Sequence, residues 1–200
     1  MNKKEIQGES FLLGLDVSTK TIGVALFNDK GKLLELTHIS PKAKPVPESK
    51  TEELIKKADL FAEFIDKYSE LNIKHIIIEE PLLRSNNVNT VGTLLRFNGM
   101  VTKIAYDKFG VTPTYISTYE ARKNAFPELM QPNASKKIVL FGAYPKDADK
   151  KKVIWEKVSK REPEITWLLD VKGQLKKENF DMSDAYAVTL AYAHLQNLFD

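Results

Sequence analysis

The segment Phe11–Phe27 constrains the fold more than any other part of this chain. An apolar run reaches a single carboxylate, Asp16, and the polar turn Ser18–Thr21 separates that run from a second apolar run. Two short apolar runs joined by a polar turn predict a β-hairpin. A carboxylate inside an otherwise buried strand costs several kcal/mol unless a positive group meets it. A metal ion is the obvious candidate for that group.

The rest of the chain alternates between strand and helix patterns, in an order typical of an α/β fold. Further strands are expected at 33–39, 73–78 and 111–116, and the run 73–78 ends abruptly at Glu79-Glu80-Pro81. Helices are expected from residue 51, over 90–109, from 117, in pieces near 135–143 and 147–161, and over 181–198. Three antiparallel strands followed by two parallel strands predict a mixed five-stranded sheet with helices on both faces.

Length and composition favour a single domain and exclude several kinds of chemistry. The 200 residues are 42% apolar, enough for one core, so residues 1–200 are expected to form one domain. The absence of cysteine excludes disulfide frameworks, thiolate zinc sites and cysteine nucleophiles, and it fits a reducing cytoplasm. Residues 1–10 are polar and expected to be flexible, and no stretch approaches the ~20 apolar residues of a membrane span. We therefore expect a cytoplasmic protein without membrane association.

Charge is distributed unevenly along the chain. The formal net charge is only +3, yet residues 120–177 hold 14 Lys and Arg against 8 Asp and Glu. A basic, helical segment beside an acidic remainder suggests a polyanion held near a carboxylate site. A solvated helical surface is the alternative interpretation for a run such as Lys150–Lys152.

Four acids stand out by their positions, and together they suggest a metal site. Asp16 lies inside the first strand, Glu79 ends the fourth, and two more lie three residues apart at the start of the last helix, Asp181 and Asp184. Carboxylates are hard oxygen ligands suited to Mg²⁺ or Mn²⁺. Two such ions about 3.5–4 Å apart can activate a water and stabilise the leaving oxygen in phosphodiester hydrolysis.

Simpler interpretations of these acids remain open at this point. Taken alone, Asp181 is better explained as an N-cap, with Asp184 complementing the helix dipole. Side chains alternate on a strand, so only one of Glu79 and Glu80 can share the sheet face of Asp16, and spacing does not choose between them.

Three short motifs, in order, resemble those of a known nuclease family. Gly14-Leu-Asp16-Val-Ser-Thr-Lys-Thr-Ile-Gly-Val resembles the first motif of the RuvC-type Holliday-junction resolvases. Ile77-Ile-Glu79-Glu-Pro81 resembles their second motif, in which the acid follows the apolar run directly, and by this match Glu79 is the ligand. Asp181-Met-Ser-Asp184-Ala-Tyr-Ala-Val resembles the closing motif. Element order and spacing agree across residues 11–198.

This resemblance implies an RNase H-like fold and a metal-dependent endonuclease that resolves Holliday junctions. Members form homodimers, bind branched DNA such as four-way junctions, and cut it with Mg²⁺ or Mn²⁺, two ions per active site. They also use basic residues between the fifth strand and the last helix, where this chain has Lys136 and Lys137, so these are expected to support phosphate charge in the transition state. The expected metal ligands and catalytic acids are Asp16, Glu79, Asp181 and Asp184.

Two further expectations concern junction binding. The loop after Glu79 commonly carries an aromatic wedge in such resolvases, whereas this chain has Leu82 and Leu83. By the same resemblance, the dimer surface is expected on the helix 90–109. In the basic segment, Trp155 and Trp167 are explained either by stacking on bases or by packing in a core or dimer interface.

Three other functions compete with this one. The first motif also resembles YqgF-type proteins, which would make the chain a nuclease acting on structured RNA. It is similar as well to the first phosphate loop of sugar kinases and actin-like ATPases. Those need two such domains, and 200 residues are too few, so no nucleotide cofactor is expected. The last alternative is a nucleic-acid-binding RNase H-like protein without catalytic activity.

Overall fold

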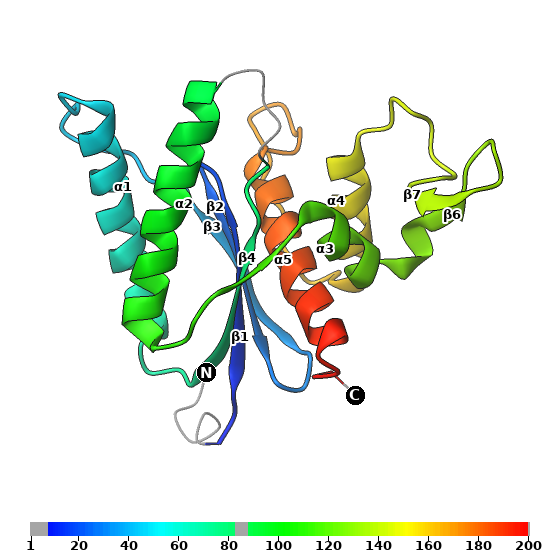
Figure 1. Ribbon diagram of the computed structural model, residues 1–200, viewed down its shortest axis with the longest axis horizontal. Helices are drawn as coiled ribbons and strands as arrows, with labels where there is room; N and C mark the ends of the chain where they lie inside the picture. The colour runs from blue at the N-terminus through cyan, green and yellow to red at the C-terminus, as the bar shows by residue number, and fades with distance from the viewer. Residues whose placement is uncertain (1–7, 83–87, 200) are drawn as a thin grey trace.

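The computed structural model describes residues 8–82 and 88–199, and its centre is one mixed five-stranded sheet (Figure 1). Its strands, in the spatial order β3-β2-β1-β4-β5, are β1 (Phe11–Val17), β2 (Ile22–Asn28), β3 (Leu33–Ile39), β4 (Ile73–Glu79) and β5 (Thr114–Ile116). Strands β1 to β3 pair antiparallel, and β4 pairs parallel with both β1 and β5. The predicted fold class is confirmed, with three antiparallel strands followed by two parallel ones.

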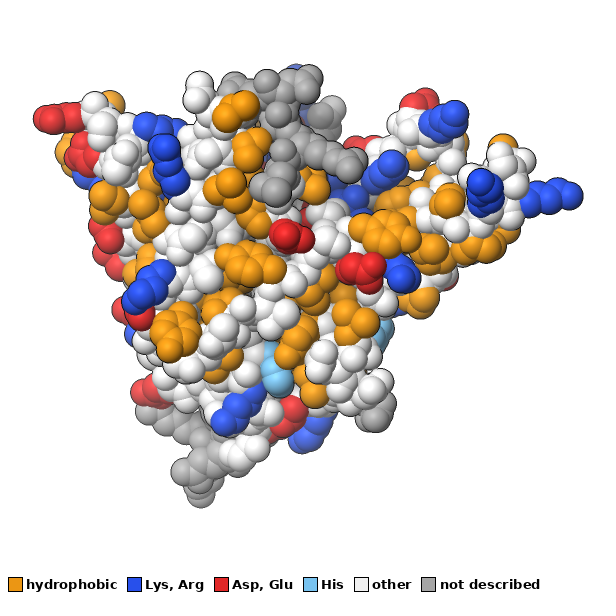
Figure 2. All heavy atoms as spheres, in the orientation of Figure 1, with side chains coloured by type: hydrophobic (Ala, Val, Ile, Leu, Met, Phe, Trp, Pro, Cys, Tyr) orange, Lys and Arg blue, Asp and Glu red, His pale blue; other side chains and the backbone are white. Residues whose placement is uncertain are grey.

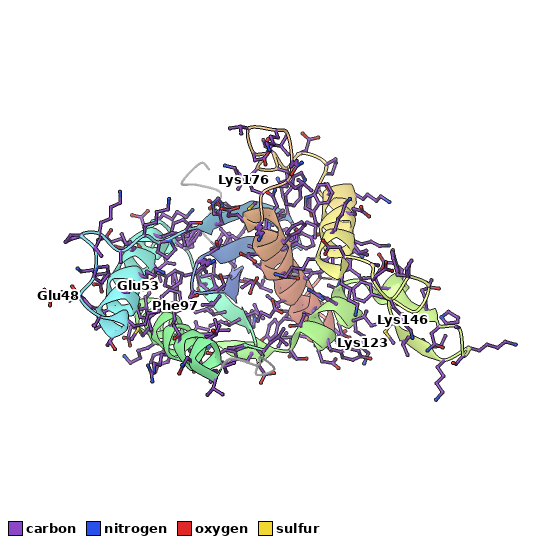
Figure 3. All side chains as sticks on the ribbon, turned by 90° about the horizontal axis from the view of Figure 1, so that it is seen from above. Glu48, Glu53, Phe97, Lys123, Lys146 and Lys176 are labelled. Atoms are coloured by element: carbon purple, nitrogen blue, oxygen red, sulfur yellow. The ribbon has the colours of Figure 1, made fainter. Side chains whose placement is uncertain are left out.

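Helices cover both faces of this sheet, as predicted. The helices are α1 (Lys50–Ile65), α2 (Val88–Phe109), α3 (Thr118–Ala125), α4 (Lys150–Arg161) and α5 (Glu178–Leu195), with short 3₁₀ turns η1 (Asp66–Tyr68) and η2 (Pro127–Leu129). Viewed from above, α1 and α2 lie on one side of the sheet and α3, α4 and α5 on the other, with Phe97 of α2 pointing toward the sheet (Figure 3). In the part of the chain that the structure describes, no helix combines the length and apolar character needed to cross a membrane.

Alternation along β1 assigns its side chains to two separate cores. Phe11, Leu13, Leu15 and Val17 are buried against α1 and α2. Leu12 packs with the helices of the opposite face, in what we call the α5-side core. Since successive strand residues point to opposite faces, Asp16 also faces α5. The acid therefore replaces an apolar side chain at the end of the α5-side core.

Two glycines allow α5 to lie directly on the sheet. A Cβ on Gly14 would lie 1.6 Å from Oγ1 of Thr189, and a Cβ on Gly23 would lie 2.1 Å from the carbonyl oxygen of Asp181. Gly23 is also the cross-strand partner of Asp16. Because neither strand carries a side chain at these points, α5 meets the sheet closely from Asp181 to Thr189, beside Asp16.

The basic segment departs from its predicted structure over 135–143, where a helix was expected. That prediction is wrong, because β6 (Met130–Pro132) and β7 (Ile138–Leu140) form an antiparallel hairpin. The side-chain oxygen of Asn133 accepts hydrogen bonds from the backbone N–H groups of Ser135 (2.9 Å) and Lys137 (3.1 Å), and Lys136 adopts φ 59°. Such side-chain bonds to the local backbone favour a turn over a helix.

Other boundaries differ by a few residues from the predicted ones. The last helix begins at Glu178, three residues before the predicted start at Asp181, and α4 begins at Lys150 with Asp149 as its N-cap. Trp155 and Trp167 contact each other edge to face, with ring centroids 5.8 Å apart, and Trp167 packs against the α5-side core. Residues 1–7 of the segment expected to be flexible lie outside the described residues.

Candidate active site

Three of the four predicted acids meet at one end of the sheet. Asp16, Glu79 and Asp184 each offer a carboxylate oxygen, and these oxygens all lie within 4.8 Å of one another. Strands β1 and β4 run parallel with Leu15 opposite Ile78, so Asp16 and Glu79 follow as neighbours at the carboxyl ends of the two strands. Asp184 reaches them from α5, which Gly14 and Gly23 admit to close contact with the sheet.

The choice between Glu79 and Glu80 follows from strand alternation. Ile77 belongs to the α5-side core, whereas Ile78 belongs to the core beneath α1 and α2. Glu79 is two residues beyond Ile77 and therefore shares its face, which is also the face of Asp16. Glu80 is exposed, and its backbone N–H donates to the carbonyl of Ile116 at 2.9 Å. The structure thus places Glu79, not Glu80, in the carboxylate cluster.

Asp181 lies at the edge of the cluster, one helical turn before Asp184. It is half-buried and lines the same cavity, of about 320 Å³, as the other three acids. The N-cap of α5 is Lys177, so Asp181 lies within the helix and the capping interpretation does not apply. The carboxylate of Asp181 is instead 3.4 Å from Nζ of Lys151.

The cluster carries more negative charge than its surroundings neutralise. Burial, followed by the charges of Glu79, Asp184 and Asp181, raises the pKa of Asp16 well above its ordinary value. Burial and the charge of Asp184 raise the pKa of Glu79 to about 7, and burial also raises the pKa of Asp181. Each shift means that the ionised form is disfavoured without an added cation.

Two cations from separate helices approach the acids. Nη2 of Arg122, on α3, is 3.1 Å from Oδ1 of Asp184, and Nζ of Lys151, on α4, is 3.3 Å from Oδ2 of the same residue. Burial alone would lower the pKa of Lys151, but the carboxylates of Asp184, Asp16 and Asp181 raise it overall. The hydroxyl of Thr118 donates a hydrogen bond to Oε1 of Glu79. Both cations therefore fix Asp184, while Thr118 fixes Glu79.

The sequence did not single out Arg122 and Lys151. It assigned the catalytic lysine role to Lys136 and Lys137, which lie in the exposed turn of the β6–β7 hairpin and do not line the cavity that holds the carboxylates. The available signal was the run Lys150–Lys152 in the first turn of a helix, where the dipole disfavours positive charge. A cation at that position is stable only if a nearby negative charge compensates the helix dipole, and for Lys151 the carboxylates of Asp181 and Asp184 do so.

The donor set suits a hard divalent cation. All the ligand atoms that converge are carboxylate oxygens, the ligand type that Mg²⁺ and Mn²⁺ prefer over soft or imidazole-binding metals. The raised pKa values of Asp16 and Glu79 also fit a site that is completed by positive charge. Leu82 lines the same cavity, and the next residue, Leu83, lies outside the described residues.

Solved structures that match the whole fold include two structures of Thermus thermophilus RuvC. Thermus thermophilus RuvC in complex with a Holliday junction substrate aligns with a TM-score of 0.60 at 12% identity, covering 94% of this chain and 95% of that one. A second Thermus thermophilus RuvC structure aligns with a TM-score of 0.54 at 16% identity, with the same coverage. No protein-family model matches the sequence, and no curated protein matches it. At this identity the likeness establishes the fold, which is RNase H-like as predicted.

Proposed function

We propose that this protein is a metal-dependent endonuclease that cuts branched DNA, with the four-way junction as its principal substrate. The observation that carries the proposal is the convergence of Asp16, Glu79 and Asp184 within 4.8 Å at the end of an RNase H-like sheet. The acids come from three separate elements, and neighbouring cations hold one of them in place. A merely structural cluster would gain nothing from burying so much like charge.

Each residue has a role that follows from its contacts. Asp16, Glu79 and Asp184, with Asp181 at the edge, would hold Mg²⁺ or Mn²⁺, in two ions per site by family resemblance. Bound metal would supply the activated water and neutralise charge at the scissile phosphate. Arg122 and Thr118 keep Asp184 and Glu79 oriented, because their hydrogen bonds restrict the carboxylates before any ligand binds.

Lys151 is the residue best placed to meet the substrate directly. Its side chain is about half exposed (48%), and its ammonium group lies at the mouth of the carboxylate cluster. When a cation neutralises the acids, this ammonium group is free to contact a phosphate oxygen. A fixed positive group there stabilises the charge that develops in the transition state.

Resolution of a four-way junction needs two matched cuts, so we include a homodimer in the proposal. Helix α2, the predicted dimer surface, exposes Leu95 (44%) and Tyr106 (45%), and Ile55 on the adjacent α1 is 48% exposed. Apolar side chains exposed on neighbouring helices are typical of surfaces that associate.

The test compares cleavage of a synthetic four-way junction with cleavage of a linear duplex of the same sequence, both with Mg²⁺. We expect cuts near the branch of the junction and little cutting of the duplex. Asp184→Asn is the matched loss-of-function control, because it keeps the size of the side chain and removes its charge. Equal cutting of both substrates would leave a nuclease that does not select junctions. Preferential cutting of a structured RNA would favour the YqgF-like alternative.

A further inference from the structure

A second cavity, of about 590 Å³, lies beside the β6–β7 hairpin and outside the carboxylate site. The hairpin and the loop that leads to α4 enclose it, and we call it the hairpin pocket. This part of the chain projects from the rest of the molecule (Figure 1), and Lys146 lies on it in the view from above (Figure 3). The residues that matter for its chemistry are Asn133, Ser135, Phe141, Tyr144, Lys146 and Lys150.

The charge of the hairpin pocket favours an anion. Lys146 and Lys150 line it, and its described lining residues include no aspartate or glutamate, although Asp147 and Asp149 lie in the same loop between lining residues. Within the described ranges, neither lysine has a carboxylate at ion-pair distance, whereas Lys151 is paired with Asp181 and Asp184. Figure 2 shows further Lys and Arg side chains gathered on this projecting end. A ligand with negative charge would supply ion-pair partners for Lys146 and Lys150.

The position of Lys150 is unfavourable for the helix itself. It is the first residue of α4, where the helix dipole disfavours a positive side chain, and the first turn contains no acid. The side chain of Asp149 caps the helix by accepting from the N–H groups of Lys151 (3.1 Å) and Lys152 (3.2 Å). The cap therefore gives no reason for a lysine at 150. Its Nζ instead lies 6.0 Å from the centroid of the Phe141 ring, on the wall of the hairpin pocket.

The pocket also presents an aromatic wall that the loop backbone holds in place. Tyr144 is half-buried and meets Phe141 edge to face, with ring centroids 5.9 Å apart. Phe141 adopts φ 62°, a left-handed conformation that is rare for a bulky residue. Its N–H donates to the carbonyl of Leu129 at 2.8 Å, and its carbonyl accepts from Tyr144 N–H at 3.0 Å. Strain of this kind is typical of functional sites.

The hairpin pocket lies next to the carboxylate site. Lys150 lines the pocket and Lys151, the next residue, lines the cavity of the acids, so the first turn of α4 separates the two. Consider a nucleic-acid strand with one phosphate at the carboxylate cluster. If this strand continues toward the hairpin, it passes the first turn of α4. Aromatic side chains combined with lysines are the usual means of binding unpaired nucleotides.

We propose that the hairpin pocket binds one unpaired nucleotide of the DNA strand that is cut, with its base stacked on Tyr144 and its phosphates against Lys146 and Lys150. The identity of the strand rests on the proposed function. The pocket itself does not, because its charge and its aromatic wall are independent of the acids. Base pairs at a branch end their arms and open more readily than pairs inside an uninterrupted duplex, so a nucleotide there is more easily taken up unpaired.

The test measures binding of a fluorescent oligodeoxythymidine of about six residues to the full chain, in EDTA so that no cleavage occurs. Tyr144→Leu keeps an apolar contact with Phe141 and removes the aromatic face, and we expect affinity to fall about tenfold. Tyr144→Phe keeps the face, so its affinity should stay within about twofold of wild type. Tyr119→Leu, at an exposed tyrosine on α3 that lines neither the hairpin pocket nor the cavity of the acids, is the matched control and should bind as wild type does.

The lysines have their own readout. Lys146→Ala combined with Lys150→Ala should reduce the slope of log affinity against log salt by roughly 0.7 for each phosphate that the variant no longer neutralises. A 5-iodouracil in the oligonucleotide should crosslink to Tyr144, a result that a purely structural tyrosine would not give. The proposal is overturned if the folded Tyr144→Leu protein binds with wild-type affinity and the folded double-lysine variant keeps the wild-type salt slope. Because no cutting is measured, failure here leaves junction cleavage standing, and failure of junction cleavage leaves the pocket standing.

Discussion

Removal of the negative charge at Glu79 should stabilise the metal-free protein while destroying its activity. Burial, together with the charge of Asp184, raises the pKa of Glu79 from its ordinary value of 4.5 to about 7, against the opposing effects of Thr118, Arg122 and Lys151. Glutamine has nearly the same shape. Its amide oxygen can still accept the hydrogen bond that Thr118 donates.

The magnitude and sign of the effect follow from proton linkage. A pKa of about 7 in the folded state, against 4.5 when unfolded, corresponds to about 3 kcal/mol. Below pH 4.5 the Glu79 carboxyl keeps its proton in both the folded and the unfolded state, so no stability is lost. Between 4.5 and about 7 the unfolded state releases the proton first, so stability falls as pH rises, and above about 7 the whole loss remains. Glu79→Gln should therefore gain about 3 kcal/mol near pH 8 and about 1 kcal/mol or less near pH 5.

Urea and thermal unfolding in EDTA measure this difference. Near pH 8 the expected gain corresponds to a rise in Tm of roughly 6–12 °C for a chain of this size. Glu80→Gln, at the exposed neighbour, should change stability by no more than about 0.5 kcal/mol and should retain most of the cleavage activity. A destabilised Glu79→Gln protein, or an equal gain at both pH values, would refute the electrostatic reasoning.

The remaining predictions concern packing, the ammonium group at the site, and the metal. Gly14→Ala should cost about 1–3 kcal/mol or more, because its Cβ would lie 1.6 Å from the Thr189 hydroxyl. Gly99→Ala, where a Cβ meets nothing within 4 Å, should instead gain up to about 1 kcal/mol, and thermal melts of both variants check the contrast. Lys151→Ala should slow the single-turnover rate of junction cleavage at saturating substrate, whereas Lys152→Ala should not. Equal rates for the two variants would contradict the role of Lys151. Mg²⁺ should raise the Tm of wild type in proportion to the logarithm of its concentration, with a smaller rise for Glu79→Gln, and an unchanged wild-type Tm would count against the metal site.

The sequence was sufficient to predict the sheet, and to single out in advance the three acids that meet at its end, because both depend on local pattern. Asp16 interrupts an apolar strand, and Glu79 ends another, so their strands and approximate positions could be predicted without knowing how the chain packs. Distinguishing Glu79 from Glu80 required the register of β4 against β1, which spacing does not specify. The family resemblance, and not the residue pattern, made that choice in advance.

The cations of the site could not be predicted in the same way. Arg122 and Lys151 reach Asp184 because α3 and α4 both pack against α5, a long-range arrangement with no signature in the local sequence. The segment predicted as helix, 135–143, contains β7, a run of three apolar residues that is too short to show a period. The turn chemistry of Asn133 was the signal that favoured the hairpin.

The variant Asp16→Asn shows whether the carboxylate cluster is the active site of a nuclease. The measurement is the single-turnover rate of cutting a four-way junction with Mg²⁺, for protein whose unfolding transition and junction affinity match those of wild type. Loss of this ligand should reduce the rate by a factor of about 10² or more while leaving the junction bound. A rate equal to that of wild type would contradict the account.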